Sequence, residues 1–316
     1  MKQLFNKSYE KISLGLFCLI IFLGFWFIFD PSCVYFQQQP IFLTTNFYFI
    51  NFLKYPGGFA EYIGTFLGQF LYIKITGSVI ITLIIFVSIL LTKETLKIFS
   101  KENKIVLLQF IPSILFAGSL VNYDTNFQLI ITYIITSFLF IVNSKIKHQA
   151  IRVIVYTLFQ FIIFYLFSSS ALYLFTTLVI LFELTQHSKK NKITATSVAF
   201  IFSILLVYFF ARISPYMNTE KALKGIFFNA SILSLAAYIS LPLTIIMHIS
   251  IGHKFQKHIS TFTNSLIAFA SIALLVISLW GTFNKTERDL IKILQYASEE
   301  KWDEVIEAAI ALVTGC

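Results

Sequence analysis

Asp30 is the residue of this sequence best placed to do chemistry. It ends the first long apolar run and is followed by Pro31. A carboxylate at that point would be held by a helix end beside water, within reach of a lipid-linked substrate. Partial desolvation would raise its pKa towards that of a useful general base. The alternative is an interfacial residue that only ends the helix.

Further candidates lie in the connections that follow. Asp124, between the third and fourth apolar runs, could act as a second carboxylate. Lys54 is the nearest candidate to contact a phosphate group, because the first connection contains no arginine. We therefore predict catalytic roles for Asp30, Asp124 and Glu61, and substrate-binding roles for Lys54, Tyr55, Tyr62 and Gln69.

No metal site and no cofactor is expected. The three cysteines, Cys18, Cys33 and Cys316, form no CxxC pair and no cluster with histidines at ligand spacing. Glycine-rich nucleotide loops and the HExxH and GxSxG motifs are also missing from the sequence.

Membrane helices must position these residues. Of the 316 residues, 57% are hydrophobic and 12% are charged, about half the charged fraction of a soluble domain. A helix crosses ~30 Å of hydrocarbon with about 20 apolar residues, and it satisfies its own backbone there. The runs that suit this role are Ile12–Phe29, Ile75–Leu91, Ile105–Val121, Phe127–Val142, Ile151–Phe167, Ala171–Leu184, Ile193–Ile213, Ile226–Ile249 and Thr263–Trp280. The predicted fold is an all-α polytopic transmembrane helix bundle with about nine spans.

The fifth and sixth runs are separated only by Ser168, Ser169 and Ser170. They could form a tight helical hairpin or one long interrupted helix. We favour the hairpin, because one helix of about 33 apolar residues would overshoot the bilayer.

Positive charges alternate between the two sides of this predicted bundle. One set of alternate connections, which includes the N-terminus, holds 15 lysines and arginines, and the other holds five. Because cytoplasmic connections carry the excess, we predict a cytoplasmic N-terminus, an extracytoplasmic C-terminus and a multi-pass location in the bacterial inner (plasma) membrane. The net charge of +9 then reflects topology, and nucleic acid is not an expected partner. Glu183, in a basic connection, is expected on a solvated face.

The outer connection, residues 30–74, is long enough to be functional. Its second half, residues 58–72, has apolar residues at three- and four-residue spacing, and Pro56, Gly57 and Gly58 break the chain before it. The polar residues Glu61, Thr65 and Gln69 share the other face. This pattern predicts an amphipathic helix along the outer membrane surface, which Gly64 and Gly68 would let pack closely on a span.

The segment 281–316 holds seven of the 15 acids and is expected to form two amphipathic helices. Trp302, followed by Val305 and Ile306, resembles the opening helix of a tetratricopeptide-type repeat. A solenoid helix needs a partner for its apolar face, so we expect this to be the truncated start of a longer repeat. The alternative is a two-helix tail on the membrane surface. The predicted domains are a transmembrane helical domain, residues 1–280, and an outer-face helical tail, residues 281–316.

The order of these features resembles that of membrane glycosyltransferases of the GT-C type. Those enzymes have a first span ending in an acid, a long first outer loop with surface helices, and many further spans. The resemblance implies a polyprenyl-phosphate sugar as donor, Asp30 as base or acceptor-orienting group, and Asp124 as the second acid. The likeness is architectural, because the loop lacks a pair of acids after the first span.

A second resemblance rests on sequence. The stretch Tyr55–Tyr62, the pair Gln69-Phe70 and the Trp302-centred tail resemble an uncharacterised bacterial multispanning family with a domain of unknown function and C-terminal tetratricopeptide-like helices. This resemblance implies no activity.

Three functions remain open from the sequence. The first is GT-C-like glycosyl transfer from a polyprenyl-phosphate-linked donor at the outer leaflet. The second is a non-enzymatic membrane scaffold that binds a protein partner through the tail. The third is a transporter, which the lack of charged residues at mid-span does not support.

Overall fold

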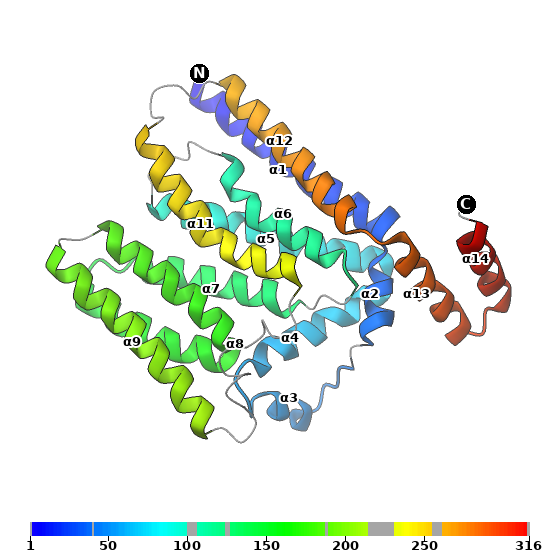
Figure 1. Cartoon of the computed structure of the whole chain (residues 1–316), viewed down its shortest axis with the longest axis horizontal. Coiled ribbons are helices and arrows are strands. Elements are labelled where there is room, and N and C mark those ends of the chain that lie inside the picture. Colours follow the sequence, from blue (N-terminus) through cyan, green and yellow to red (C-terminus); the bar gives the residue numbers. More distant parts are fainter. Residues whose placement is uncertain are drawn as a thin grey trace.

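The computed structural model describes residues 2–39, 41–99, 106–123, 127–186, 189–213, 231–254 and 261–314. Within these ranges the regular structure is helical and no strand is present (Figure 1). Five of the described helices are long and apolar enough to cross a membrane: Lys11–Phe29, Lys74–Phe99, Gln149–Thr185, Ala195–Arg212 and Ile232–Ser250. Shorter apolar helices occur at Ile111–Leu120, Gln128–Ser144 and Ala270–Thr282. These lengths and compositions are consistent with a membrane protein, while nine spans and their orientation stay predictions.

The bundle is built from long helices packed around an aromatic core. Its helices are α1 (Lys2–Gly24), α5 (Lys74–Phe99), α6 (Ile111–Leu120), α7 (Gln128–Ser144), α8 (Gln149–Gln186), α9 (Lys189–Ile213), α11 (Ile232–Lys254) and α12 (Thr261–Thr282). Helix α6 packs against α11 and α12, and α5 packs against α1 and α7. Large aromatic side chains such as Phe17, Phe116, Tyr133 and Phe140 are fully enclosed between them.

Helix α8 folds back on itself at Ser168, where the backbone leaves the helical region (φ 76°, ψ 176°). Arg152 and Glu183 are 31 positions apart, which corresponds to about 46 Å along a straight helix. The Nε of Arg152 nevertheless lies 2.7 Å from Oε1 of Glu183. Gln160 Nε2 likewise donates a hydrogen bond to Thr176 Oγ1 at 2.9 Å. The predicted hairpin is therefore confirmed.

The third apolar run forms a shorter helix than predicted. A 3-10 turn, η3 (Val106–Gln109), precedes α6, which has 10 residues. Ten residues rise about 15 Å, half of the hydrocarbon thickness. Pro112 lies in the first turn of α6. Because proline lacks an N–H and its ring clashes with a preceding helical turn, it begins this helix instead of kinking a longer one.

The first long connection folds into three helices and a short turn. They are α2 (Pro31–Gln38), α3 (Asn46–Phe52), α4 (Gly58–Gln69) and the 3-10 turn η2 (Phe70–Tyr72). The helix expected at 58–72 is present as α4 and η2, whereas α3 was not predicted. Gly64 lies close against Gln128 at the start of α7, as its small size suggested. The position of α4 on a membrane surface stays a prediction.

The turn before α4 fits against the tip of the α8 hairpin. Gly57 has φ 90°, a conformation that glycine adopts without strain. Its N–H donates to the carbonyl of Tyr165 at 3.0 Å, and Tyr165 Oη donates to the carbonyl of Leu53 at 2.7 Å. A Cβ on Gly57 would lie 2.9 Å from the Cβ of Ser168. The loop and the hairpin tip therefore share one end of the bundle.

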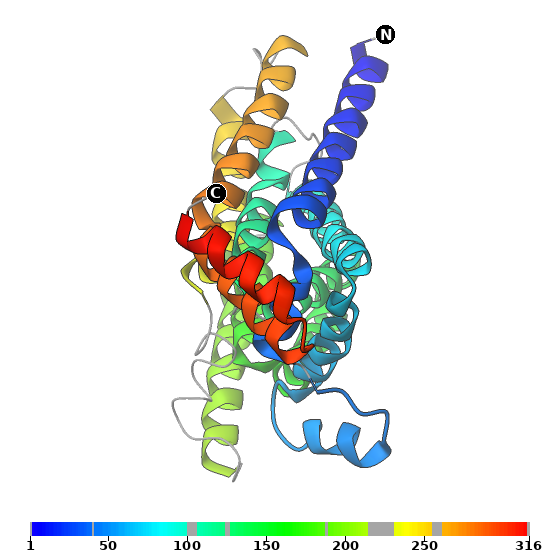
Figure 2. The ribbon, with the colours of Figure 1, turned by 90° about the vertical axis from the view of Figure 1, so that its right-hand side faces the viewer.

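The two tail helices form where expected, as α13 (Lys285–Ser298) and α14 (Trp302–Thr314). Asn284 caps α13 by accepting a hydrogen bond from the backbone N–H of Glu287 at 3.2 Å. Helix α14 packs on α13, and the pair lies beyond the end of α12 (Figures 1 and 2).

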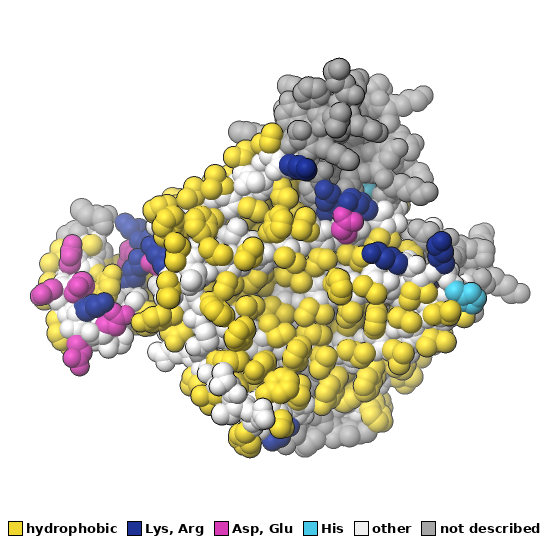
Figure 3. All heavy atoms as spheres, turned by 180° about the vertical axis from the view of Figure 1, so that it is seen from behind, with side chains coloured by type: hydrophobic (Ala, Val, Ile, Leu, Met, Phe, Trp, Pro, Cys, Tyr) yellow, Lys and Arg dark blue, Asp and Glu magenta, His cyan; other side chains and the backbone are white. Residues whose placement is uncertain are grey.

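One face of the bundle is largely covered by hydrophobic side chains, bounded on one side by Lys and Arg and on another by the acid-bearing tail (Figure 3). On α5 the exposed apolar residues Ile75, Val79, Leu83 and Val87 recur every four residues. Large contiguous apolar areas are rare on water-facing surfaces. Contact with lipid accounts for such a face.

Candidate functional site

Asp30 lies at an unusual turn between α1 and α2. The first apolar helix ends in a π-helical turn, η1 (Phe25–Phe29), and Asp30 follows with φ 54° and ψ 91°. Few non-glycine residues adopt a positive φ, although Asp does so more often than most. Its Oδ1 accepts hydrogen bonds from Ser32 Oγ at 2.7 Å and Ser32 N at 3.3 Å. Asp30 therefore caps α2, with Pro31 in the first turn where no N–H is needed.

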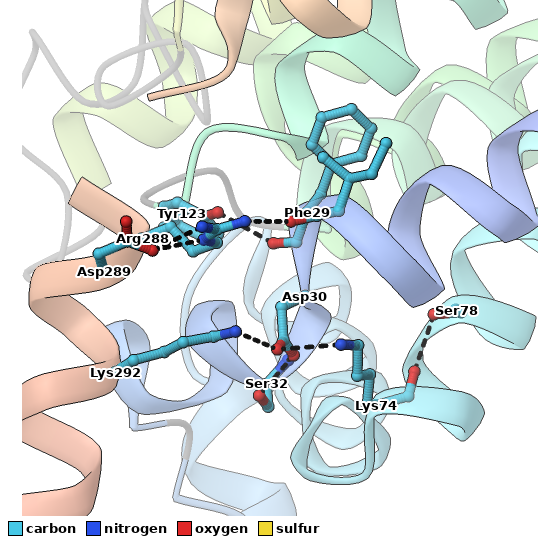
Figure 4. A network of polar contacts seen from close by, with 10 residues as sticks. Phe29, Asp30, Ser32, Lys74, Ser78, Tyr123, Arg288, Asp289 and Lys292 are labelled. Atoms are coloured by element: carbon cyan, nitrogen blue, oxygen red, sulfur yellow. Dashed lines mark hydrogen bonds and ion pairs between the residues drawn. The ribbon is translucent and has the colours of Figure 1, made fainter. Parts of the chain in front are cut away.

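Two lysines from separate segments meet this carboxylate (Figure 4). Lys74, the first residue of α5, places its Nζ 3.4 Å from Asp30 Oδ2, and Lys292 of α13 places its Nζ 3.0 Å from the same oxygen. The Asp30 side chain is 8% exposed, whereas those of Lys74 and Lys292 are 38% and 28% exposed. The carboxylate is thus enclosed, while both lysine side chains are partly exposed.

Further contacts tie other segments to the same helix end. Tyr123 Oη donates to the carbonyl of Phe29 at 2.9 Å, and Arg288 Nη1 donates to the carbonyl of Ile28 at 3.0 Å. Carbonyls in the last turn of a helix lack an intrahelical partner, so these side chains satisfy them. Arg288 also pairs with its neighbour Asp289. We call Asp30, Lys74, Lys292 and Arg288 the Asp30 cluster.

The pKa of Asp30 lies below that of a free aspartate, opposite to the expectation from the sequence. Burial acts to raise this pKa, but the hydrogen bond from Ser32 and the positive charges of Lys292 and Lys74 outweigh it. The prediction of a raised pKa was wrong because Lys292 comes from the far end of the chain. Asp30 is ionised at neutral pH, which suits it to orient a hydroxyl group or to hold cations.

Glu61 and Lys54 have other partners. Glu61 Oε2 accepts a hydrogen bond from Tyr55 Oη at 2.8 Å. Burial raises the pKa of Tyr55, and the hydrogen bond to Glu61 raises it further. Lys54 Nζ donates to Asn51 Oδ1 at 2.7 Å and lies over the ring of Phe47. Among the described residues, none of these contacts is shared with Asp30.

The other predicted site residues are placed as follows. Tyr62 of α4 lies at the centre of an aromatic group, with the rings of Phe49 and Phe52 of α3 and of Phe42, which precedes α3, around it. Gln69 ends α4. Asp124 lies outside the described residues. The structure therefore brings Tyr55, Glu61 and Tyr62 together on one segment and leaves Asp30 in a separate group.

The sequence reading missed the basic members of the Asp30 cluster. One signal was present: Asp30 ends the first long apolar helix and Lys74 begins the next, so both belong to the same end of the bundle. The sequence does not indicate that Lys292 and Arg288 lie near Asp30, because their position depends on the direction in which α13 leaves α12.

The comparisons with known proteins give a family. The model of a family of unknown function, DUF6057, matches residues 7–311, nearly the whole chain. The chain belongs to the DUF6057 family. This agrees with the predicted membership of an uncharacterised family. No curated protein and no solved structure matched the chain.

The charges of the Asp30 cluster determine which ligands it could bind. Two ammonium groups that share one carboxylate leave a surplus positive charge, and both lysine side chains are partly exposed. Such a pair can bind a phosphate through charge-assisted hydrogen bonds. Within the described ranges, no group of three or more His, Cys, Asp or Glu side chains could hold a metal ion.

A second ion pair in this DUF6057 chain joins the two arms of the α8 hairpin. Glu183 is bound by Arg152 through two hydrogen bonds of 2.7 and 3.1 Å, and their side chains are 0% and 3% exposed. Arg152 also donates to the carbonyl of Ile146 at 3.0 Å. The expectation that Glu183 is solvated was wrong, because the two arms of the α8 hairpin enclose it.

Proposed function

We propose that this protein is an integral membrane protein that binds the phosphate of a lipid-linked substrate at the Asp30 cluster. The supporting observation is the meeting of Lys74 and Lys292 at an enclosed carboxylate, directly after an apolar helix. A helix end of this kind lies at the level of lipid headgroups, where ammonium groups meet phosphates. With the predicted orientation, this is the outer leaflet.

The activity that fits this site best is GT-C-like glycosyl transfer from a polyprenyl-phosphate sugar. The acceptor oxygen would bond to the anomeric carbon while the bond from that carbon to the phosphate oxygen breaks, and the proton of the acceptor hydroxyl would pass to the departing phosphate. Negative charge then develops on the departing phosphate, where Lys74 and Lys292 would stabilise it. Asp30, already ionised, would accept a hydrogen bond from the acceptor hydroxyl and keep the two lysines in place.

Binding is the first test. The full-length protein in nanodiscs would be titrated with a fluorescent polyprenyl phosphate, with the uncharged polyprenol as the matched lipid. We expect Lys292→Met and Lys74→Met each to weaken phosphate binding about tenfold, since each removes one charge-assisted contact worth about 1.5 kcal/mol. Lys54→Met removes a lysine outside the cluster and should leave the affinity unchanged. Equal binding of polyprenol, or equal loss in all three variants, contradicts the proposal.

Catalysis is tested separately in cells. Asp30→Asn keeps a side-chain oxygen that can cap α2 but removes the charge that orients the acceptor. We expect it to insert normally and to abolish the cellular glycan product. If product formation is unchanged in Asp30→Asn, the protein binds a phosphate lipid without this transfer activity.

A scaffold role is supported by one feature of the tail. Trp302 and Ile306 of α14 are exposed, as are Leu290 and Leu294 of α13. Under this alternative, removing the chain after Trp280 abolishes binding of a protein partner, whereas Lys292→Met leaves it intact. The two variants therefore separate a scaffold from a lipid-phosphate site.

A further inference from the structure

Residues 41–54 expose apolar side chains on one side and place half-buried aromatic rings against α4 on the other. Ile41, Leu43, Phe47 and Ile50 are 72%, 51%, 74% and 52% exposed. On the packed side, the rings of Phe42, Phe49 and Phe52 lie 5.0, 4.9 and 5.8 Å from the ring of Tyr62 on α4.

The segment is also held by hydrogen bonds. Thr45 caps α3 by accepting from the backbone N–H of Tyr48, and Tyr48 Oη donates to the carbonyl of Ile41. A helix as short as α3 is not stable alone in water. Its packing on Tyr62 fixes its orientation, so the exposed side chains are presented by a defined surface.

We propose that residues 41–54, which we call the loop anchor, insert Ile41, Leu43, Phe47 and Ile50 into lipid at the membrane surface. The first argument is charge. Residues 31–53 contain no Asp, Glu, Lys, Arg or His, so no charged side chain in this stretch opposes insertion at the membrane surface. Its exposed polar residues, among them Thr44, Thr45 and Asn46, are uncharged.

The position of Lys54, at the end of the loop anchor, also favours lipid as the partner of this surface. Its Nζ lies 5.9 Å from the centre of the Phe47 ring and donates to Asn51. The ammonium thus lies over an exposed aromatic ring and is bound to a polar side chain of the same segment. This is the arrangement of lysines at membrane interfaces, where the head remains among lipid headgroups.

Continuity with the apolar face of the bundle is the third argument. Exposed Phe66 and Phe70 of α4 and η2 are followed by exposed Tyr72, Ile73 and Ile75, which lead to the exposed stripe on α5. In Figures 1 and 2, α3 lies at the edge of the bundle near the end where α1 finishes. Lipid covering α5 would therefore also reach the loop anchor. Helix α4, expected from the sequence to have this role, is itself partly covered by α3.

Spin labels test the loop anchor in the full-length protein. Cys18→Ala, Cys33→Ala and Cys316→Ser provide a background without native thiols, and Phe47→Cys and Ile50→Cys carry the label in phosphatidylcholine–phosphatidylglycerol nanodiscs. Leu83→Cys on the exposed face of α5 and Glu304→Cys on α14 are the matched lipid and water references. We expect the ratio of oxygen to nickel-chelate collisions at 47 and 50 to match that at 83 and to exceed that at 304 several-fold.

Three results would overturn the proposal. A collision ratio equal to that at 304 means that the loop anchor faces water. Low collision rates with both reagents mean that protein covers it, and dipolar broadening between labels identifies a second copy of the chain as that cover. If the thiol-free background does not fold, the second test is photocrosslinking. The unaltered protein in nanodiscs is irradiated with a lipid that has a photoreactive acyl chain, and the peptides that carry lipid adducts are identified. Lipid adducts on α5 peptides without adducts on 41–54 reject the proposal.

Discussion

The Arg152–Glu183 pair and the Asp30 cluster both place opposite charges together in an apolar bundle, but they are built differently. Arg152 and Glu183 belong to the two arms of one hairpin and are almost fully enclosed. The Asp30 cluster draws on the turn between η1 and α2, on α5 and on α13, and its lysines remain partly exposed. One carboxylate is held by a bidentate arginine, while the other is contacted by two lysines.

This difference indicates two kinds of role. A buried bidentate pair has every charge matched and no access for a ligand, so it serves to hold the hairpin closed. A partly exposed group with more cations than carboxylates can exchange one contact for a ligand anion. In this bundle, an ion pair with a structural role is therefore distinguished from a ligand-binding group by its burial and by its ratio of cations to carboxylates.

The largest effect is expected from breaking the buried pair. Arg152→Met removes the bidentate cation from the enclosed Glu183 carboxylate, which costs about 3–5 kcal/mol of folding free energy. The double variant Arg152→Met/Glu183→Met removes both charges and should recover most of that loss. Thermal unfolding in detergent measures both. Lys97→Met, which breaks the exposed pair with Glu94, is the control and should cost less than about 1 kcal/mol.

If Arg152→Met is as stable as Lys97→Met, the pair is not enclosed as described, and the comparison with the Asp30 cluster loses its basis. A double variant no more stable than the single one would show that Arg152 acts through its bond to the Ile146 carbonyl instead.

A smaller effect is expected at the junction between the tail and the bundle. Lys292→Met removes one of the two cations on Asp30, and the partial exposure of Lys292 limits the cost to about 1–2 kcal/mol. The loss should be local, because Arg288 still holds the Ile28 carbonyl. Hydrogen exchange should therefore speed up in α13 and stay unchanged in α5. Faster exchange throughout the bundle would contradict a local junction.

The pH dependence of the same junction follows from the lowered pKa of Asp30. Its folded-state pKa lies below the ordinary value of 3.8, so the carboxylate contributes stability that is fully present above that value. This contribution is lost only as the pH falls through the lower folded-state value. Exchange in α13 should thus be constant, after correction for intrinsic rates, from about pH 8 to pH 5. A transition near neutral pH would mean that another group controls the tail.

The sequence predicted what depends on local hydropathy. The apolar runs, the helix at 58–72 and the α8 hairpin follow from composition and spacing, which act over a few turns. The sequence also contains a signal for the ion pair across the hairpin, since Arg152 and Glu183 are nearly equidistant from Ser168. Pairing across a symmetric hairpin was therefore predictable, and the buried pair could have been found.

What depends on packing between distant segments could not be predicted. The meeting of Lys292 with Asp30 requires the path of α13 beyond α12, and the covering of Tyr62 by α3 requires the fold of the whole loop. The prediction of a raised pKa for Asp30 was wrong for this reason. Desolvation at a helix end can be inferred from the local sequence, but the lysines that lower the pKa come from distant segments.

The smallest effect is expected at Glu61. It tests whether Glu61 has a role different from that of Asp30, the other carboxylate of the first loop. Tyr55→Phe removes the hydrogen bond to Glu61, at a cost of about 0.5–1.5 kcal/mol, and Glu61→Gln should cost no more because an amide oxygen can still accept from Tyr55. Since neither residue contacts the Asp30 cluster in the described structure, both variants should bind polyprenyl phosphate as the unaltered protein does. Thermal unfolding and the nanodisc titration measure the two quantities on the same samples. Loss of binding in Glu61→Gln without loss of stability would place Glu61 at the substrate, and the site would then extend along α4 from Asp30 to the hairpin tip.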